Sequence, residues 1–121
     1  MTLPNQALTG RRVLLVEDDY FIGVDLKSWF EEGGAQVLGP VPSVTEALAL
    51  IASTDEIDAA VLDINLQDEL VYPVADALHA RGVPFLFATG YDPAAVPAPH
   101  RAVALCQKPI DPQIVARTLF G

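Results

Sequence analysis

Five short apolar runs recur along the chain, separated by segments with helical patterning or turn residues. The runs are rich in aliphatic and β-branched residues, a composition typical of strands that are covered on both faces. Strands that alternate with helices pair in parallel through right-handed crossovers, which places helices on both faces of the sheet. The sequence therefore predicts an α/β fold with a doubly wound, five-stranded parallel sheet. The predicted strands are Arg12–Val16, Gln36–Gly39, Ile57–Leu62, Pro84–Ala88 and Ala102–Cys106.

Capping residues indicate where the helices begin and end. An Asp or Ser before a helix accepts hydrogen bonds from the first N–H groups of the helix. A glycine commonly ends a helix, because it adopts the left-handed conformation without steric cost. The first helix carries a broad apolar stripe that includes Phe21, Trp29 and Phe30, and Gly33-Gly34 ends it. The predicted helices run from Asp19 to about Glu32, from Ser43 to about Ala52, from Pro73 to Gly82, and from Asp111 to Gly121.

The remaining segments are predicted to be irregular. Residues 1–10 are expected to form a flexible tail, and residues 11–121 a single domain. The stretch Asn65–Tyr72 is expected to be a loop. Three prolines between Tyr91 and His100 make a regular helix doubtful, so any fourth helix there should be weak or irregular.

Charge and cysteine content exclude several classes of function. The net charge of −9, with only 7 Lys and Arg residues, argues against a nucleic-acid partner and against an anionic membrane surface. Cys106 is the only cysteine, so an internal disulfide is impossible and a reducing cytoplasm is expected. No Cys/His cluster suggests zinc, and His79 and His100 are interpreted as solvated surface residues.

Polar residues follow four of the predicted strands at the point where each strand ends. Glu17 and Asp18 follow the first strand, Asp63 the third, Thr89 the fourth, and Lys108 the fifth. Carboxyl ends of parallel strands meet at one edge of the sheet, where ligands bind in folds of this kind. Three carboxylates there suit Mg²⁺, an ion that prefers oxygen ligands and bridges to phosphate.

The same residues suit phosphoryl transfer. A carboxylate can attack phosphorus and form an acyl phosphate, a lysine can offset phosphoryl charge, and a threonine can donate a hydrogen bond to a phosphoryl oxygen. Each residue also has an ordinary explanation. Acidic residues before a helix act as caps, a Lys-Pro pair forms turns, and threonine favours strands. The coincidence of all of them at strand ends favours the functional interpretation.

The motifs LLVEDD, LDINL, FATGY and CQKPI, in this order and spacing, resemble the receiver domains of bacterial two-component response regulators. This resemblance implies the flavodoxin-like receiver fold and covers nearly all of the chain after residue 10. It implies that Asp63 accepts a phosphoryl group from a histidine kinase or a phosphotransfer protein, with Mg²⁺ as cofactor. Receivers are signalling domains rather than enzymes, with at most slow self-phosphorylation from small donors and autodephosphorylation.

The resemblance also implies roles for the other site residues. Asp18 would bind Mg²⁺ directly, Glu17 would act through metal-bound water, and the backbone carbonyl of Asn65 would complete the protein ligands. Thr89 and Lys108 would bind the phosphoryl group.

A narrower resemblance concerns residues 84–91, PFLFATGY, which fit the PFxFATGY signature of a receiver subfamily. Members are often stand-alone receivers that work with histidine kinases of the HWE type, and the length of this chain agrees with a stand-alone regulator. One departure from the receiver pattern is Leu105, which occupies the position of an aromatic residue that usually moves with the threonine. The response is therefore expected to pass through Gly90 and Tyr91, with residues 91–100 becoming more ordered on phosphorylation.

Three functions other than that of an output regulator are compatible with parts of the pattern. A haloacid-dehalogenase-like phosphatase is disfavoured because Asn65 stands where that family has an acidic proton donor. A constitutive pseudo-receiver is disfavoured by the intact set of site residues. A phosphate sink that drains a kinase remains open, as do the kinase, the downstream partner, the phosphoryl lifetime and the oligomeric state.

Overall fold

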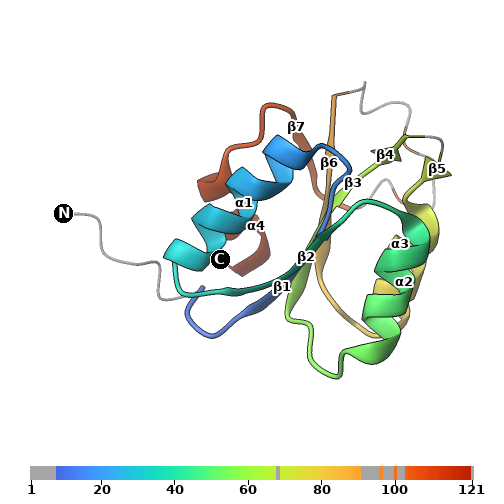
Figure 1. Ribbon diagram of the computed structural model, residues 1–121, viewed down its shortest axis with the longest axis horizontal. Coiled ribbons are helices and arrows are strands. Elements are labelled where there is room, and N and C mark those ends of the chain that lie inside the picture. The colour runs from blue at the N-terminus through green and yellow to red at the C-terminus, as the bar shows by residue number, and fades with distance from the viewer. Residues whose placement is uncertain (1–7, 68, 91–95, 97–99, 101–102, 121) are drawn as a thin grey trace.

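The computed structural model describes residues 8–67, 69–90, 96, 100 and 103–120, and five parallel strands lie at its centre (Figure 1). Their order in the sheet is β2-β1-β3-β6-β7, and every neighbouring pair is parallel. This order confirms the predicted doubly wound, flavodoxin-like sheet. The strands are β1 (Arg12–Val16), β2 (Gln36–Val41), β3 (Ala59–Asp63), β6 (Phe85–Thr89) and β7 (Leu105–Gln107).

Among the residues described, two helices cover each face of the sheet (Figure 1). On one face lie α1 (Tyr20–Glu32) and α4 (Pro112–Phe120), and on the other lie α2 (Val44–Ser53) and α3 (Tyr72–Ala80). The predicted caps are confirmed: Asp19 Oδ1 accepts hydrogen bonds from Phe21 N at 3.0 Å and Ile22 N at 3.1 Å, and Ser43 caps α2. None of the helices described is long and apolar enough to cross a membrane.

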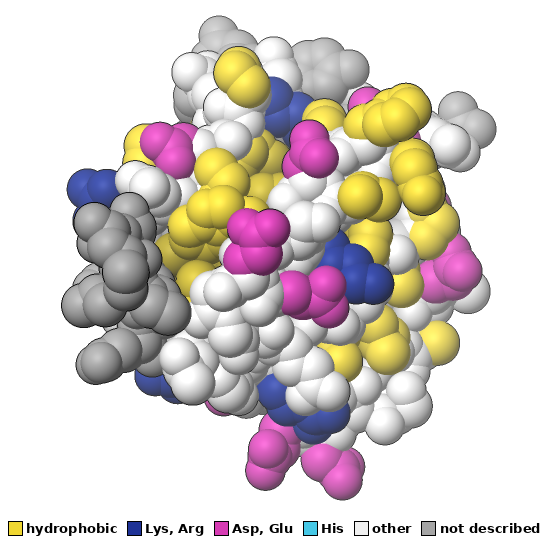
Figure 2. Space-filling model, turned by 60° about the vertical axis from the view of Figure 1, so that its left-hand side comes forward, with side chains coloured by type: hydrophobic (Ala, Val, Ile, Leu, Met, Phe, Trp, Pro, Cys, Tyr) yellow, Lys and Arg dark blue, Asp and Glu magenta, His cyan; other side chains and the backbone are white. Residues whose placement is uncertain are grey.

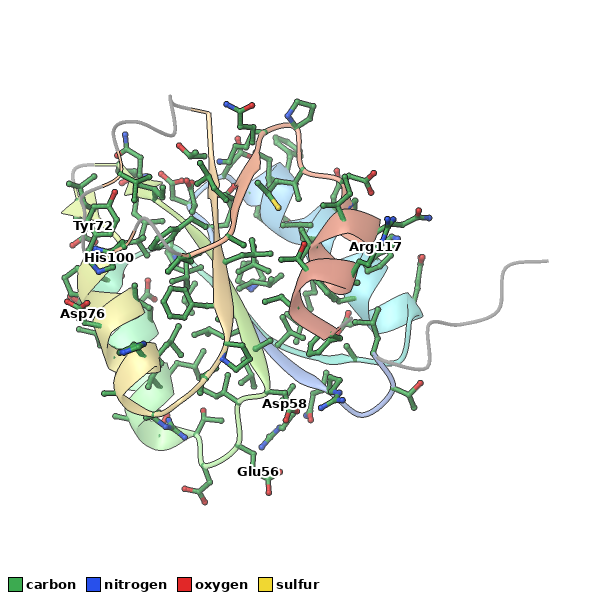
Figure 3. The ribbon with its side chains drawn as sticks, turned by 180° about the vertical axis from the view of Figure 1, so that it is seen from behind. Glu56, Asp58, Tyr72, Asp76, His100 and Arg117 are labelled. Carbon is green, nitrogen blue, oxygen red and sulfur yellow. The ribbon has the colours of Figure 1, made fainter. Side chains whose placement is uncertain are left out.

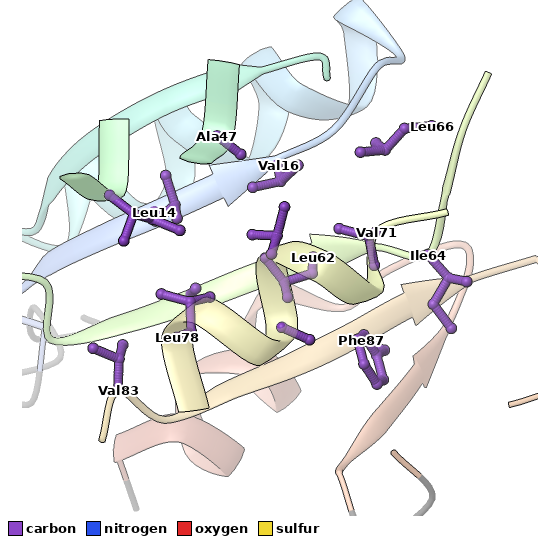
Figure 4. Packing of buried hydrophobic residues seen from close by; sticks show 14 of the residues in the cluster. Leu14, Val16, Ala47, Leu62, Ile64, Leu66, Val71, Leu78, Val83 and Phe87 are labelled. Carbon is purple, nitrogen blue, oxygen red and sulfur yellow. The ribbon is translucent and has the colours of Figure 1, made fainter. Parts of the chain in front are cut away.

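The core forms two clusters, one on each face of the sheet. The α2/α3 cluster includes Leu14, Leu62 and Phe87 from the strands and Leu78 from α3 (Figure 4). The α1/α4 cluster contains the alternate strand residues, which face the opposite way because side chains alternate along a strand. All five residues of β3 are buried, which explains its continuous apolar run. The α1/α4 cluster includes Leu15, Val61, Leu86, Leu26, Phe30 and Val115.

The apolar stripe predicted for the first helix is too broad. Only Gly23, Leu26 and Phe30 of α1 are buried, whereas Phe21 is 77% exposed and Trp29 is half-buried. Helical residues are spaced by about 100°, so Phe21 lies on the far side of the helix from Gly23. The buried face of α1 is therefore narrow, and its first turn presents aromatic side chains to solvent.

The segment predicted as a loop after β3 contains a short hairpin, so that prediction is wrong. Strands β4 (Asn65–Leu66) and β5 (Glu69–Leu70) pair antiparallel. Leu66 is 1% exposed and belongs to the α2/α3 cluster. Burial of this side chain therefore holds the hairpin against the core. Glu69 Oε2 accepts a hydrogen bond from Val44 N at 3.0 Å, which ties the hairpin to the start of α2.

The bounds of two strands differ from the predicted ones, because backbone pairing with a neighbouring strand defines where a strand begins and ends. Asp63 is the last residue of β3 and pairs with Ala88, so it belongs to the strand instead of following it. The last strand is described as Leu105–Gln107, where its residues pair with Phe87, Ala88 and Thr89 of β6, while Ala102, the predicted first residue, lies outside the described residues.

Leu8 lies before the domain boundary predicted at residue 11, and it packs into the core of the fold. This side chain is fully buried in the α1/α4 cluster, and a Cβ at Gly33 would lie 2.6 Å from its Cδ1. Gly10 N donates a hydrogen bond to Gly34 O at 3.0 Å, which fixes the approach to β1. Sequence composition alone did not reveal that Leu8 closes the end of α1.

Replacing Leu8 with alanine should therefore destabilise the protein by about 2–4 kcal/mol, the range for removing a buried leucine side chain. Chemical unfolding of the two proteins would measure the difference. Leu70→Ala is the matched control, because Leu70 is 54% exposed and its truncation should cost less than about 0.5 kcal/mol. Equal losses in the two variants would contradict the burial of Leu8.

Most of the stretch from Tyr91 to His100 lies outside the described residues, and with it the predictions of an irregular fourth helix and of ordering on phosphorylation. Val96 and His100 are described, and the interpretation of His100 as solvated surface is wrong. Its side chain is 14% exposed, and its Nε2 lies 3.0 Å from Asp76 Oδ1. The ring stacks on Tyr72 at 4.7 Å, so His100 packs on α3 (Figure 3).

Candidate functional site

The site lies at the carboxyl edge of the sheet. Asp63 and Thr89 are the last residues of β3 and β6, and Glu17 and Lys108 directly follow β1 and β7. The pairing of β3 with both β1 and β6 brings these strand ends side by side. The fold therefore gathers residues from positions 17 to 108 at one place.

One ammonium group joins two buried carboxylates at the centre of the site. Lys108 Nζ donates to Glu17 Oε1 at 2.9 Å and to Asp63 Oδ2 at 3.1 Å. The Lys108 side chain is 24% exposed, whereas those of Glu17 and Asp63 are 5% and 6% exposed. Lys108 N donates to Thr89 O at 2.8 Å, which anchors the lysine backbone to β6. The lysine is thereby held against Asp63 by both its backbone and its side chain.

Asp63 is oriented from a second direction. Asn65 N donates a hydrogen bond to Asp63 Oδ1 at 3.2 Å, while Lys108 holds Oδ2. Its two carboxylate oxygens therefore have different partners, which fix the orientation of the side chain.

Three carboxylates in the site fit a divalent metal. One oxygen from each of Glu17, Asp18 and Asp63 lies within 4.8 Å of the others. Glu17 Oε2 is buried and accepts no hydrogen bond from any described residue, which leaves an unpaired acceptor in the cluster. Hard oxygen donors of this kind are the ligands of Mg²⁺. The donor set and the unpaired oxygen agree with the expected ion.

Electrostatics point the same way. Burial, followed by the neighbouring Asp63, raises the pKa of Glu17 from 4.5 to about 8, against the lowering effect of Lys108. Burial lowers the pKa of Lys108, but its hydrogen bonds to Glu17 and Asp63 outweigh this, so the net shift is upward. One ammonium offsets the charge of only one carboxylate. Without a metal, Glu17 therefore keeps its proton until the pH reaches its pKa of about 8.

In metal-free buffer the protein should therefore lose stability as the pH rises from about 4.5 to about 8. Because the pKa of Glu17 is higher in the folded state than in the unfolded state, its contribution is complete below the unfolded pKa. It is lost as the pH passes the folded pKa. We expect a loss on the order of 2–4 kcal/mol, measured by urea unfolding across this range.

Glu17→Gln is the control for this pH dependence. The variant keeps the shape of the side chain but cannot ionise, so the loss of stability should be largely absent. Saturating Mg²⁺ should also remove the loss in the wild type, since a cation can replace the proton. Identical pH profiles for wild type and variant in metal-free buffer would refute the assignment to Glu17.

An open pocket with a volume of about 590 Å³ lies over the site. Of the residues predicted for the site, Asp18, Asp63, Asn65, Gly90 and Lys108 line it. Glu17 and Thr89 are buried and do not line it.

Asp19 and Gln67 also line the pocket. The sequence places Asp19 in the acidic run Glu17-Asp18-Asp19 after the first strand and also at the cap of the first helix. No sequence signal marked Gln67, because its place depends on the hairpin that the sequence did not reveal.

The predicted switch residues are only partly described. Gly90 is exposed and lines the pocket, whereas Tyr91 lies outside the described residues. Leu105 is half-buried, pairs with Phe87 and packs against the α2/α3 cluster. Leu105 therefore contributes to the core at the position expected for a mobile aromatic.

Known structures resemble the chain over nearly its whole length. The solution structure of SdrG from Sphingomonas melonis Fr1 is 40% identical and covers 95% of this chain and 96% of its own, with a TM-score of 0.78. SdrG in a BeF3-activated conformation, described as from Pseudomonas melonis Fr1, is 38% identical, with coverages of 89% and 92% and a TM-score of 0.74.

A third similar structure is a receiver domain by its name. The receiver (REC) domain of the response regulator PhyR from Erythrobacter litoralis is 26% identical and covers 93% of this chain and 88% of its own, with a TM-score of 0.77. No protein-family model and no curated protein matches the chain. The strand order, the acidic cluster joined to a lysine and the similarity to SdrG and PhyR agree, and the chain belongs to the response regulator receiver domains.

Proposed function

We propose that Asp63 accepts a phosphoryl group from a phosphohistidine of a histidine kinase or a phosphotransfer protein, in a reaction that requires Mg²⁺. The observation that carries this proposal is the position of Lys108 Nζ between Asp63 and Glu17, with Asp18 within the same cluster. A cation and three carboxylates, two of which line an open pocket, provide a nucleophile, charge compensation and ligands for a metal at one point.

The transfer follows from these groups. An oxygen of Asp63 attacks phosphorus, a new P–O bond forms, and the P–N bond of the phosphohistidine breaks with its electron pair on the imidazole nitrogen. Glu17, Asp18 and Asp63, with the backbone carbonyl of Asn65, would hold Mg²⁺, whose charge lowers the electrostatic cost of bringing a phosphoryl group to a carboxylate. Lys108 and Thr89 would bind phosphoryl oxygens.

The first turn of α1 offers a docking surface for the donor. Tyr20 and Phe21 are 74% and 77% exposed and directly follow Asp18 and Asp19 at the pocket. Figure 2, which brings forward the side of the molecule that carries α1, shows hydrophobic side chains at the surface among charged ones. A histidine-bearing helix that packed on this turn would reach the pocket. The PFLFATGY segment favours a kinase of the HWE type.

The direct test is intact-mass measurement after incubation with acetyl phosphate, with and without Mg²⁺. A gain of one phosphoryl group per chain only in the presence of Mg²⁺ is the expected result. BeF3, which yielded an activated conformation of SdrG, would serve as a phosphoryl mimic in parallel experiments. A chain that gains no mass under either condition would contradict the proposal.

Asp18→Ala tests the metal ligands. The variant should lose Mg²⁺ affinity by roughly tenfold or more, because it removes a carboxylate from the cluster. It should also gain thermal stability in metal-free buffer, because it relieves repulsion between like charges. Mg²⁺ titration followed by Trp29 fluorescence and thermal unfolding would measure both effects. An unchanged Mg²⁺ affinity would remove Asp18 from the metal site.

Signalling then depends on how long the phosphoryl group remains. An output regulator changes its protein contacts while it is phosphorylated, whereas a phosphate sink loses the group without engaging a downstream partner. The lifetime of the acyl phosphate at Asp63 is therefore the quantity that separates these two functions.

A further inference from the structure

The hairpin after β3 places Gln67 at the edge of the phosphorylation site. Gln67 directly follows β4 and lines the same pocket as Asp63 and Lys108. No role follows for it from the assignments above, because the nucleophile, the metal ligands and the phosphoryl-binding groups are other residues. The question is what a carboxamide does at this point of the pocket.

The backbone of Gln67 is in an unfavourable conformation. Its φ is 54°, and it is the single non-glycine residue with positive φ among the residues that the structure describes. The left-handed region costs a side chain of this kind roughly 1 kcal/mol, a cost that glycine avoids. Asparagine also tolerates this region better than glutamine does. Residues held in such conformations concentrate at functional sites, which makes this one a candidate.

The hairpin holds Gln67 firmly in place. Leu66, its neighbour, is 1% exposed in the α2/α3 cluster. Across the hairpin, Glu69 accepts a hydrogen bond from Val44 N at 3.0 Å, and Val71 N donates to Ile64 O at 3.0 Å. Gln67 is thus fixed relative to Asp63, four residues earlier in the chain.

The chemistry of the lining restricts the role further. Asp18, Asp19 and Asp63 offer only acceptors when ionised, and Lys108 offers only donors. A carboxamide both donates and accepts hydrogen bonds, so it can orient a water molecule next to a phosphoryl group without adding charge. Gln67 is exposed, which leaves its carboxamide accessible to water in the pocket.

We propose that Gln67 orients the water that hydrolyses the phosphorylated Asp63 and thereby shortens the lifetime of the phosphoryl group. In this step the water oxygen bonds to phosphorus, the bond between phosphorus and the Asp63 oxygen breaks, and its electron pair returns to the carboxylate. Both protons of the water leave with the phosphate as H2PO4⁻. Gln67 neither gains nor loses a proton. This inference rests on the proposed phosphorylation of Asp63.

The test compares the decay of the phosphorylated wild type with that of three Gln67 variants at saturating Mg²⁺. Each protein is phosphorylated with acetyl phosphate, freed of the donor, and followed by intact mass. Gln67→Ala and Gln67→Gly should both lengthen the lifetime by roughly three- to tenfold. Gln67→Asn, which keeps a shorter carboxamide, should give an intermediate lifetime.

Stability measurements separate this role from a structural one. Gln67→Gly should raise the melting temperature, because glycine relieves the positive φ, whereas Gln67→Ala should leave it nearly unchanged. The proposal is supported if the phosphoryl lifetime depends on whether a carboxamide is present at position 67, while the melting temperature depends on whether the residue there is glycine. Gln113→Ala, on the exposed first turn of α4, is the control and should change neither quantity.

The two proposals fail in different ways. If wild-type protein gains no phosphoryl group, the phosphoacceptor proposal is wrong. If the wild type is phosphorylated but Gln67→Ala and Gln67→Gly decay at the wild-type rate or faster, the role of Gln67 is wrong and the phosphoacceptor proposal stands.

Discussion

Asp63→Asn is expected to abolish phosphorylation by acetyl phosphate or by a kinase. The substitution preserves the size of the side chain and an oxygen that can accept from Lys108 Nζ, which lies 3.1 Å from Asp63 Oδ2 in the wild type. An amide is a far weaker nucleophile than a carboxylate, so no acyl phosphate should form. Intact mass measured with saturating Mg²⁺ should show the wild type gaining one phosphoryl group and the variant gaining none. The wild-type adduct should be labile to base.

Asp25→Asn provides the matched control, because Asp25 is an exposed residue of α1 that does not line the pocket. This variant should be phosphorylated at the wild-type rate. Asp63→Asn should also be more stable than the wild type in metal-free buffer, since it removes one ionisable group from a cluster of three carboxyl groups. Stoichiometric phosphorylation of the Asp63→Asn variant would show that another residue is the acceptor.

The site could be predicted from sequence because it depends on strand ends. Short apolar runs locate the strands, parallel pairing brings their carboxyl ends together, and the residues at those ends follow directly. Glu17, Asp63 and Lys108 were gathered in this way, and the structure places them within hydrogen-bond distance. The caps Asp19 and Ser43 were equally predictable, because a cap is a local hydrogen bond between neighbouring residues.

The features that escaped prediction depend on contacts between distant residues. Leu8 is buried because it meets the end of α1, and His100 is anchored because Asp76 and Tyr72 lie on α3. The β4–β5 hairpin has no glycine or asparagine turn between its strands, and it forms because Leu66 is buried and Glu69 bonds to α2. Gln67 could not be assigned to the site without that hairpin. Local patterns contain no information about such contacts.

The pair formed by Glu17 and Lys108 has a further consequence. The resemblance to receiver domains implied a water-mediated metal role for Glu17, whereas the structure also gives it a direct 2.9 Å hydrogen bond to Lys108. Lys108 therefore has two tasks. It compensates buried carboxylates in the resting protein, and in the proposed reaction it binds the phosphoryl group.

Lys108→Met is expected to destabilise the metal-free protein by about 2–4 kcal/mol above about pH 8, where the pKa of Glu17 is exceeded, since it leaves Glu17 and Asp63 both ionised and buried without their cation. The loss should shrink toward about pH 5, where Glu17 is protonated in both proteins because its folded pKa is about 8. Urea unfolding at several pH values would measure it. Lys27→Met is the control. It removes the charge of the only other lysine of the sequence, which lies on α1, and it should cost less than about 1 kcal/mol.

The double variant Lys108→Met/Glu17→Gln separates the two tasks of the lysine. Without the charge of Glu17, the site no longer needs a cation to balance a second buried carboxylate, so most of the lost stability should return. Phosphorylation by acetyl phosphate should remain slowed by at least about tenfold, because no ammonium is present to stabilise the transferred phosphoryl group. If the double variant recovered both stability and the wild-type phosphorylation rate, Lys108 would serve the fold alone. A Lys108→Met variant as stable as the wild type would instead show that the buried carboxylates do not depend on the lysine.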